Sequence, residues 1–337
     1  RLRIRMSSGG RGVLLGHITD AHVAPLGRPT TVLKHHSVRI IEDLVDQFRL
    51  RGVDLALFGG DNIDNRGHGH EDLEAFAAAA ERLDRFVTII GNHEASSPAR
   101  GRITADDFAR RMDGRGIRRG AYNFVESVDD VRIIGIDTTL QGSPGGYVSR
   151  ATMSFLARAL HEGDEPHVVV LGHHLLYRSW EPYSLSTWDH EYLVANREHV
   201  TALLASSPRV RAYLCGHHHA SRIQRVLTRG HHGGFYQILT ASPVAFPHHA
   251  RLLRFAADGI HVETLVPRIE GLVEEGRDAV LYGRKARRYA TLGASRTFLE
   301  YVQGGPRDNE VVLPYDAAPV LERRGVTPLP HLAPRIS

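Results

Sequence analysis

Residues 13–22 read VLLGHITDAH, and this stretch sets a pattern that the chain repeats. The apolar run Val13 to Ile18 is typical of a buried strand, and the polar residues Asp20 and His22 follow it directly. In an extended segment, residues two apart point to the same side, so the Asp20 carboxylate and the His22 imidazole could converge on one metal ion. Asp-x-His alone is a weak signal, and its weight comes from repetition of the arrangement.

Four further apolar runs are followed by polar residues in the same way. The motifs are Gly59-Gly60-Asp61-Asn62-Ile63-Asp64, Gly91-Asn92-His93-Glu94, Gly172-His173-His174 and Gly216-His217-His218-His219. An isolated Asp after a strand is more often a turn or helix cap, but open α/β sheets bind ligands at the carboxyl ends of their strands. Together the motifs therefore predict one metal centre. Its candidate ligands are Asp20, His22, Asp61, Asn92, His173, His217 and His219.

The predicted elements alternate and indicate an α/β fold. The other expected strands of the first part are Leu55 to Phe58, Phe86 to Ile90, Val131 to Ile136, Val168 to Leu171 and Arg211 to Leu214. The expected helices are Ser37 to Leu50, Glu71 to Leu83, Ala151 to Leu160 and Glu191 to Leu204. From Ile223 onward, strand-like pieces predict a second sheet packed on the first.

Three regions are expected along the chain. Residues 1–12 are predicted to form an N-terminal arm, residues 13–267 the catalytic domain and residues 268–337 a C-terminal extension. The extension contains a charged stretch around Arg284 to Arg288 and a predicted helix near Ser295 to Val302. It could cover the active site, pack on the sheet or mediate a homodimer, and packing or dimerisation is favoured.

The composition excludes several classes of protein. The chain has 337 residues, of which 42% are hydrophobic, and no apolar run approaches the length of a membrane span or forms a leader. A single cysteine, Cys215, rules out an internal disulfide and a cysteine zinc site, so a cytoplasmic location is expected. The formal charge of +4 comes without a long basic patch interleaved with aromatic residues, which makes nucleic acid an unfavoured partner.

The five motifs, in this order, resemble those of the calcineurin-like metallophosphoesterases, over roughly residues 13–265. Within that family the sequence is most similar to the bacterial class III cyclic-nucleotide phosphodiesterase group. The narrower resemblance rests on Asp61 and Asp64 in Gly-Asp-x-x-Asp, on Gly-His-His at His173, and on Thr240-Ala241-Ser242-Pro243 with Pro247 after it. Leu175-Leu176 departs from the proline that many members carry there, and it is expected to alter the loop rather than the ligand.

The resemblance implies a four-layer α/β/β/α sandwich of two mixed sheets that holds two metal ions. It assigns one ion to Asp20, His22, Asp61 and His219 and the other to Asp61, Asn92, His173 and His217, with Asp61 as the bridge. Oxygen and imidazole ligands without thiolate suit manganese, iron, zinc or cobalt, as a divalent or mixed-valence pair. Such a pair would generate a hydroxide between the ions and polarise the phosphoryl oxygens.

Residues beside the ligands are candidates for catalysis or substrate contact. His93 is expected to stabilise the transition state or protonate the leaving group, with Glu94 or Asp64 orienting it. His174 is expected either to support the ligands or to contact substrate, and His218 to be structural. Tyr177 and Arg178, with Trp180, could stack on a base or grip a phosphate, or could lie in an exposed loop.

The remaining histidine pairs are expected in solvated loops, because no carboxylate lies near them in sequence. They are His35-His36, His231-His232 and His248-His249.

The sequence thus predicts a phosphodiesterase that acts on cyclic nucleotides or other small phosphodiesters. A phosphomonoesterase acting on nucleotides or sugar phosphates is the alternative, and a non-catalytic scaffold on the same fold is a remote one. A scaffold would be expected to lose ligand residues, whereas all seven are present. Fold alone does not select the substrate.

Overall fold

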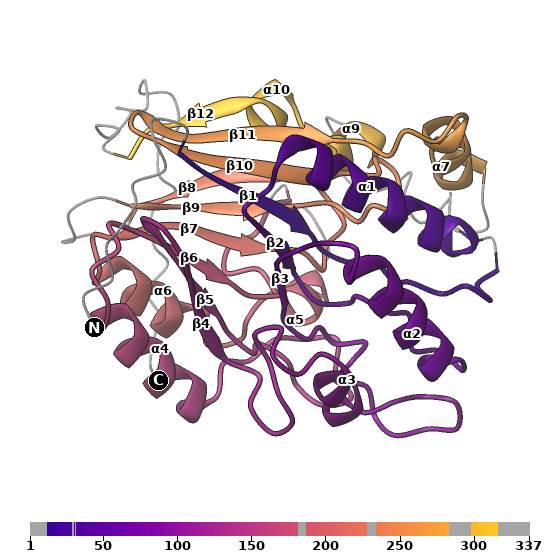
Figure 1. The fold of residues 1–337 in the computed structure, drawn as a ribbon, viewed down its shortest axis with the longest axis horizontal. Helices are drawn as coiled ribbons and strands as arrows, with labels where there is room; N and C mark the ends of the chain where they lie inside the picture. Colours follow the sequence, from indigo (N-terminus) through magenta and orange to yellow (C-terminus); the bar gives the residue numbers. More distant parts are fainter. Residues whose placement is uncertain are drawn as a thin grey trace, which may run out of the picture.

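Two six-stranded mixed sheets form the centre of the protein in the computed structural model (Figure 1). The structure describes residues 12–28, 30, 32–180, 187–227, 234–282 and 298–315. Across each sheet, from one edge to the other, the strand order is β12-β11-β10-β1-β2-β3 in the first sheet and β4-β5-β6-β7-β9-β8 in the second.

The first sheet comprises β1 Val13–Ile18, β2 Leu55–Phe58, β3 Phe86–Thr88, β10 Ala250–Ala256, β11 Gly259–Leu265 and β12 Val311–Leu313. The second comprises β4 Phe124–Val128, β5 Val131–Gly135, β6 His167–Leu171, β7 Val210–Cys215, β8 Arg222–Val226 and β9 Phe235–Leu239. Strands β1, β2 and β3 run parallel to one another, as do β5, β6, β7 and β9.

The helical elements are η1 Lys34–His36, α1 Ser37–Arg51, α2 Gly69–Ala80, α3 Ala105–Arg111, α4 Arg150–His161, α5 Thr187–Tyr192, α6 Arg197–Ala205, α7 Leu272–Tyr282, α9 Phe298–Gln303 and α10 Pro306–Asn309. Helix α1 shows why these sequences form helices, because Ile40, Leu44 and Phe48 recur on one buried face. It ends at Gly52, which adopts the left-handed conformation that favours glycine (φ 64°).

The side chains of β6 show that the layers are stacked as the resemblance implies. Val169 and Leu171 pack into the apolar core between the two sheets, together with Leu214 of β7 and Leu15 of β1. Val168 and Val170 point to the other face and pack into a second core, which contains Leu156 of α4 and Val200 of α6. Helices α1 and α2 cover the outer face of the first sheet (Figure 1). The predicted four-layer α/β/β/α sandwich is therefore confirmed.

One predicted helix is wrong. The stretch Glu191 to Leu204 was expected to be continuous, but α5 ends at Tyr192 and α6 begins at Arg197. Between them the backbone bonds to other segments instead of to itself: the Val194 amide donates to the Leu175 carbonyl (2.9 Å) and the Ala195 amide donates to the Gly146 carbonyl (2.7 Å). These contacts over long sequence separations override the helical periodicity.

The described part of the C-terminal extension packs on the sandwich. Strand β12 pairs with β11 and so becomes an edge of the first sheet, and α10 precedes it. The predicted helix near Ser295 to Val302 corresponds to α9, whereas residues 295–297 and the charged stretch Arg284 to Arg288 lie outside the described residues.

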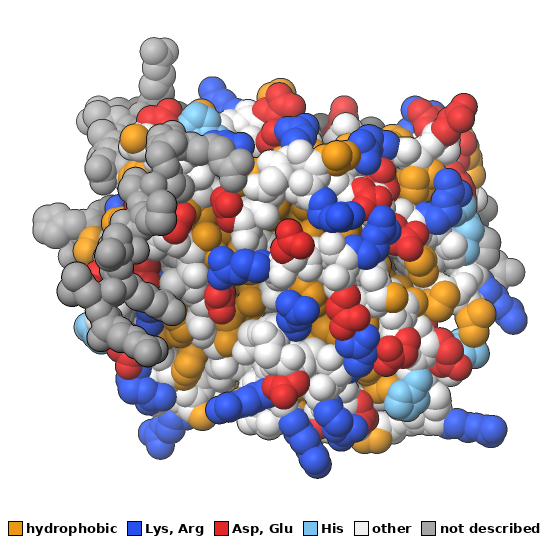
Figure 2. Space-filling model, in the orientation of Figure 1, with side chains coloured by type: hydrophobic (Ala, Val, Ile, Leu, Met, Phe, Trp, Pro, Cys, Tyr) orange, Lys and Arg blue, Asp and Glu red, His pale blue; other side chains and the backbone are white. Residues whose placement is uncertain are grey.

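Within the described ranges, no helix has the length and apolar character needed to cross a membrane. On the face drawn in Figure 2, arginine and lysine side chains alternate with acidic ones over the described surface. This face therefore lacks the continuous basic surface that follows a nucleic acid backbone.

Candidate metal centre

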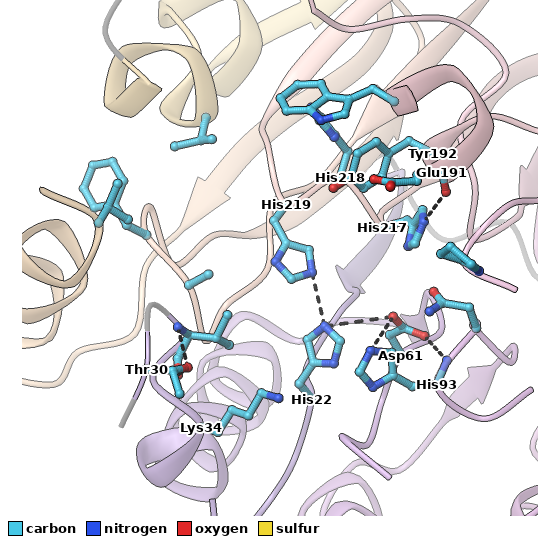
Figure 3. A pocket seen from close by; sticks show the side chains of 18 of the residues that line it. His22, Thr30, Lys34, Asp61, His93, Glu191, Tyr192, His217, His218 and His219 are labelled. Carbon is cyan, nitrogen blue, oxygen red and sulfur yellow. Dashed lines mark hydrogen bonds and ion pairs between the residues drawn. The ribbon is translucent and has the colours of Figure 1, made fainter. Parts of the chain in front are cut away.

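The carboxyl ends of β1, β2, β3, β6 and β7 meet at one side of the two sheets and bring the five motifs together. In a first group, His219 Nε2 lies 3.3 Å from Asp20 Oδ1 and 3.1 Å from His22 Nε2. His22 Nε2 in turn lies 4.0 Å from Asp61 Oδ2. His219 points at His22, and His22 and His93 face Asp61 (Figure 3).

A second group contacts the same oxygen of Asp61. His173 Nε2 is 3.4 Å from Asp61 Oδ2 and 3.2 Å from Asn92 Oδ1. His217 joins Asp20, Asp61 and His173, with the candidate ligand atoms of these four residues within 4.8 Å of one another. All seven predicted ligand residues are thus brought together in overlapping groups that share the Asp20 and Asp61 carboxylates.

The polar atoms of this site fit a bound cation. Asp20 is fully buried, and its Oδ1 accepts no hydrogen bond from any described residue. Its Oδ2 is fixed by the Thr19 hydroxyl (2.8 Å) and the His217 amide (2.7 Å). A buried carboxylate oxygen without a partner costs free energy unless a ligand or ion supplies one. The donor set of carboxylates, an amide oxygen and imidazoles suits a borderline divalent metal.

Backbone carbonyls orient two of the imidazole rings. His173 Nδ1 donates to the Gly59 carbonyl at 2.9 Å, and His217 Nε2 donates to the Glu191 carbonyl at 2.8 Å. Hydrogen bonds of this kind fix the tautomer of a metal-binding histidine. They leave His173 Nε2 and His217 Nδ1 as the nitrogens available to an ion.

The side chains of the Asp-x-His and His-x-His motifs converge, but the backbone conformation expected to cause this is wrong. Both were expected to be extended, but Asp20 and His22 have φ values of 55° and 40°, and His217 and His219 have values of 67° and 53°. Asp61 is also left-handed, with φ 49°. Non-glycine residues rarely adopt this conformation, and such strain is typical of functional sites. Tight left-handed turns, rather than a pleated strand, aim these side chains.

A glycine leaves room for the shared carboxylate. A Cβ atom on Gly91 would lie 2.2 Å from Asp61 Oδ1, so any larger residue would displace Asp61. This oxygen also accepts a hydrogen bond from the His93 amide at 2.8 Å. The Gly91-Asn92-His93 turn therefore fixes the carboxylate as well as contributing its own side chains.

The Asp61 carboxylate and the imidazoles around it stabilise each other's charged forms. Burial lowers the pKa of His173, but the Asp61 carboxylate outweighs it and raises this pKa to about 9. Conversely, burial would favour the neutral acid at Asp61, yet the surrounding imidazoles of His173 and His93 hold its pKa well below the ordinary value. A carboxylate that stays ionised when buried is suited to binding a cation.

His93 also faces the centre, and with His22 and Asp61 it forms a third group whose candidate ligand atoms lie within 4.8 Å of one another. Its Nδ1 donates to the Asp64 backbone carbonyl at 2.7 Å and lies 3.6 Å from Asp64 Oδ1. Its Nε2 lies 3.8 Å from Asp61 Oδ2. Of the two expected orienting partners, the structure thus places Asp64 at His93.

Glu94 has a different position from the one expected of an orienting or substrate-contacting residue. Its side chain is fully buried, and Oε2 accepts from the amides of Asp61 (3.0 Å) and Gly91 (2.7 Å). Oε1 accepts from the amides of Asn62 (2.8 Å) and Ile63 (3.2 Å). Burial and the nearby Asp61 carboxylate raise the pKa of Glu94 to about 7, against these hydrogen bonds, which lower it. Glu94 therefore fastens the second motif to the third.

We expect Glu94→Gln to destabilise the protein by about 2 to 4 kcal/mol. A glutamine replaces one accepting oxygen with an amide NH₂ group, which leaves two buried backbone N–H groups unpaired at roughly 1 to 2 kcal/mol each. Urea unfolding of the metal-depleted protein measures the loss. Glu126→Gln, on the exposed surface of β4, is the matched control and should change stability by less than about 0.5 kcal/mol. Equal stability of the two variants would contradict the role of Glu94.

Three other residues were candidates for substrate contact. His174 is fully buried, with Nδ1 2.8 Å from the Thr138 hydroxyl and Nε2 3.1 Å from the Pro144 carbonyl, a position that agrees with the supporting role that was one of its two expected roles. Tyr177 and Arg178 are not among the described residues that line the cavity beside the centre, and Arg178 pairs with Asp189. These positions agree with the alternative of an exposed loop, and a contact of Tyr177 or Arg178 with substrate stays a prediction.

The remaining histidines are mostly not in solvated loops. His248 and His249 are buried, and His35 and His36 contact Glu275 of α7, which lies far away in sequence. His231-His232 lies outside the described residues. His218 is buried and its Nε2 is 2.6 Å from the Tyr301 hydroxyl, consistent with a structural role.

Sequence reasoning missed Lys34, which lines the cavity and pairs with Asp64. Its side chain is 15% exposed, and burial lowers its pKa. The only local signal is that it is one of two lysines in the chain.

Comparison with known proteins identifies the family. Residues 14–221, more than half of the chain, match the calcineurin-like phosphoesterase family, and this range contains all five motifs. The chain belongs to the calcineurin-like phosphoesterases. One curated relative of this phosphoesterase, "Probable glycerophosphodiester phosphodiesterase GpdQ" of Arcobacter nitrofigilis, is 26% identical over 169 residues. The match covers 49% of this chain and spans 56% of that protein, little more than half its length.

Solved structures share the fold of this calcineurin-like phosphoesterase. A dimetal phosphatase from Danio rerio superposes with a TM-score of 0.58 at 15% identity, covering 75% of this chain and 96% of that one. Purple acid phosphatase PPD1 from yellow lupin also gives 0.58, at 16% identity, covering 78% of this chain and 53% of that one. At these identities the likeness establishes the architecture.

Proposed function

We propose that this calcineurin-like phosphoesterase is a metal-dependent phosphodiesterase that hydrolyses cyclic nucleotides or other small phosphodiesters. The observation that carries the proposal is the cluster of candidate ligands around the buried Asp20 and Asp61 carboxylates, with the His93 ring and amide directed at Asp61.

The proposed ligands form two sets, as the family resemblance implies. Asp20, His22, Asp61 and His219 would hold one ion, and Asp61, Asn92, His173 and His217 the other. When bound, two such ions supply an activated water and positive charge for the phosphoryl oxygens. Manganese, iron, zinc and cobalt are all compatible with this donor set.

The side chains of the site would orient the substrate and move protons. His93, held through Nδ1 by the Asp64 carbonyl, has Nε2 directed at the centre, where it can donate to a phosphoryl oxygen or to the leaving alkoxide. Lys34, beside Asp64 on the cavity wall, adds positive charge near an anionic substrate. The Asp20, Asp61 and His173 side chains are buried, and electrostatic effects are stronger in such surroundings than in water.

Two observations favour a diester over a monoester. The cavity extends from the centre to residues of the C-terminal helices, which leaves room for a large ester group beyond the phosphate. The relative from Arcobacter nitrofigilis carries the name of a phosphodiesterase. A phosphomonoesterase remains the alternative, because the same metal chemistry serves both esters.

A metal-depletion assay tests the proposal. The metal-depleted protein should hydrolyse neither bis(4-nitrophenyl) phosphate nor 4-nitrophenyl phosphate, and added Mn²⁺ should restore activity, with kcat/KM about tenfold or more higher for the diester. Release of 4-nitrophenol measures both. A preference for the monoester would select the alternative function, and inactivity on every ester under every metal would refute hydrolysis.

A further inference from the structure

The cavity beside the candidate centre has a volume of about 460 Å³, in the range of sites for small organic molecules. At one end it is lined by the candidate ligands His22, Asp61, Asn92, His217 and His219. Its other lining comes from segments distant in sequence, three residues of which belong to the C-terminal extension: Val280, Phe298 and Val302. We refer to these three as the C-terminal wall.

Helix α7 is held at the cavity by contacts with His248 and with the two histidines of η1. Its buried face carries Leu272, Gly276 and Val280 at intervals of four residues. A Cβ atom on Gly276 would lie 2.0 Å from His248 Nε2, so only glycine allows this close approach. On the other side, Glu275 lies 3.2 Å from His35 and 3.0 Å from His36 of η1. These contacts place Val280 against the cavity.

Helix α9 is fastened directly to the loop that carries His217 and His219. The Tyr301 hydroxyl is 2.6 Å from His218 Nε2, and the Arg222 guanidinium lies 4.9 Å from the centre of the Tyr301 ring. The Ser221 amide donates to the Val302 carbonyl at 2.8 Å. The position of Phe298 and Val302 is therefore coupled to the candidate ligands through main-chain and side-chain contacts.

The lining changes in character along the cavity. Around the C-terminal wall it is apolar and aromatic, with Trp188 and Phe246 among the described residues, and Val280, Val302, Trp188 and Phe246 also belong to one apolar core. At the end near the centre lie the cations Lys34 and Arg66 (Figure 3 shows Lys34 beside His22). Such a cavity matches a ligand with an anionic group at one end and a flat apolar group at the other.

We propose that the C-terminal wall is the specificity element of this enzyme, and that it selects phosphodiesters in which one alcohol carries an aromatic group. The inference rests on the proposed phosphodiesterase function and narrows it. A nucleobase satisfies the requirement, whereas a glycerol diester offers nothing for the wall to bind.

The test compares Phe298→Ser with wild type on three substrates: bis(4-nitrophenyl) phosphate, a 3′,5′-cyclic nucleotide and glycerophosphoethanolamine. Loss of one aromatic stacking partner should lower kcat/KM about tenfold for substrates with an aromatic group. It should change kcat/KM by less than about twofold for the glycerol diester, which the wall does not contact. Phe298→Tyr, which keeps the aromatic ring, should retain most of the activity, and Leu281→Ser is the control on α7, where Leu281 is 44% exposed and outside the lining.

A binding measurement separates this inference from the proposed function. Metal-loaded wild type should bind phenylphosphonate more tightly than methylphosphonate by calorimetry, and Phe298→Ser should reduce the difference about tenfold. An equal effect of Phe298→Ser on all three substrates, or equal affinity of wild type for the two phosphonates, would overturn the C-terminal wall while leaving hydrolysis intact. Absence of turnover with every ester would instead refute the proposed function, and the phosphonate comparison would still decide the wall.

Discussion

Asp61→Asn is expected to abolish the dinuclear centre and to lower kcat/KM by more than about a thousandfold, equivalent to roughly 4 kcal/mol of transition-state stabilisation. Asp61 Oδ2 lies 3.4 Å from His173, 3.8 Å from His93 and 4.0 Å from His22, so it faces both ligand groups. Two divalent ions side by side repel each other, and among the candidate ligands only Asp20 and Asp61 carry compensating negative charge. Removing one of them should expel at least one ion.

Metal analysis by inductively coupled plasma spectrometry, with kinetics on a chromogenic diester, measures both effects. The asparagine keeps an oxygen for the hydrogen bond that the His93 amide now donates to Asp61 Oδ1, so the fold should survive. Asp137→Asn is the control, because that carboxylate accepts hydrogen bonds only from Thr139 among the described residues and lies outside the cluster. Two ions retained per chain after Asp61→Asn would disprove the bridging role.

His93→Ala should leave the metal content unchanged and reduce kcat by about 10² to 10⁴, the usual contribution of a general acid or a transition-state donor. The imidazole is oriented by the Asp64 carbonyl at 2.7 Å, and both proposed four-residue ligand sets are complete without it. KM should change little if His93 acts mainly in the transition state. Steady-state kinetics on esters with leaving groups of different pKa would show the role, since loss of a general acid affects poor leaving groups most.

Two controls frame this result. His199→Ala removes an exposed histidine of α6 and should retain wild-type kcat and metal content. Asp64→Ala keeps the backbone carbonyl that orients His93 but removes the carboxylate 3.6 Å from its ring, so a smaller loss of about tenfold is expected. Loss of metal in His93→Ala would instead identify His93 as a ligand.

Much of the architecture could be predicted from the sequence because it depends on local patterns of residues. The strands Val13 to Ile18 and Leu55 to Phe58 were predicted with the bounds that the structure gives β1 and β2. Buried parallel strands are continuous apolar runs, and a polar residue ends each of them abruptly. The prediction of one helix from Glu191 to Leu204 was wrong because the Val194 and Ala195 amides donate hydrogen bonds to the carbonyls of Leu175 and Gly146. These partners are distant in sequence, and a local pattern does not predict them.

The sequence by itself determined the family, the sandwich and the set of residues that gather at the strand ends, because residue type and order along neighbouring strands are fixed by the chain. Only the tertiary structure decided how those residues are aimed and what surrounds them. The left-handed turns at Asp20 and His217, the burial of Glu94 beneath the second and third motifs, and the C-terminal wall all depend on contacts between distant segments. Such contacts are set by packing, which short-range periodicity does not encode.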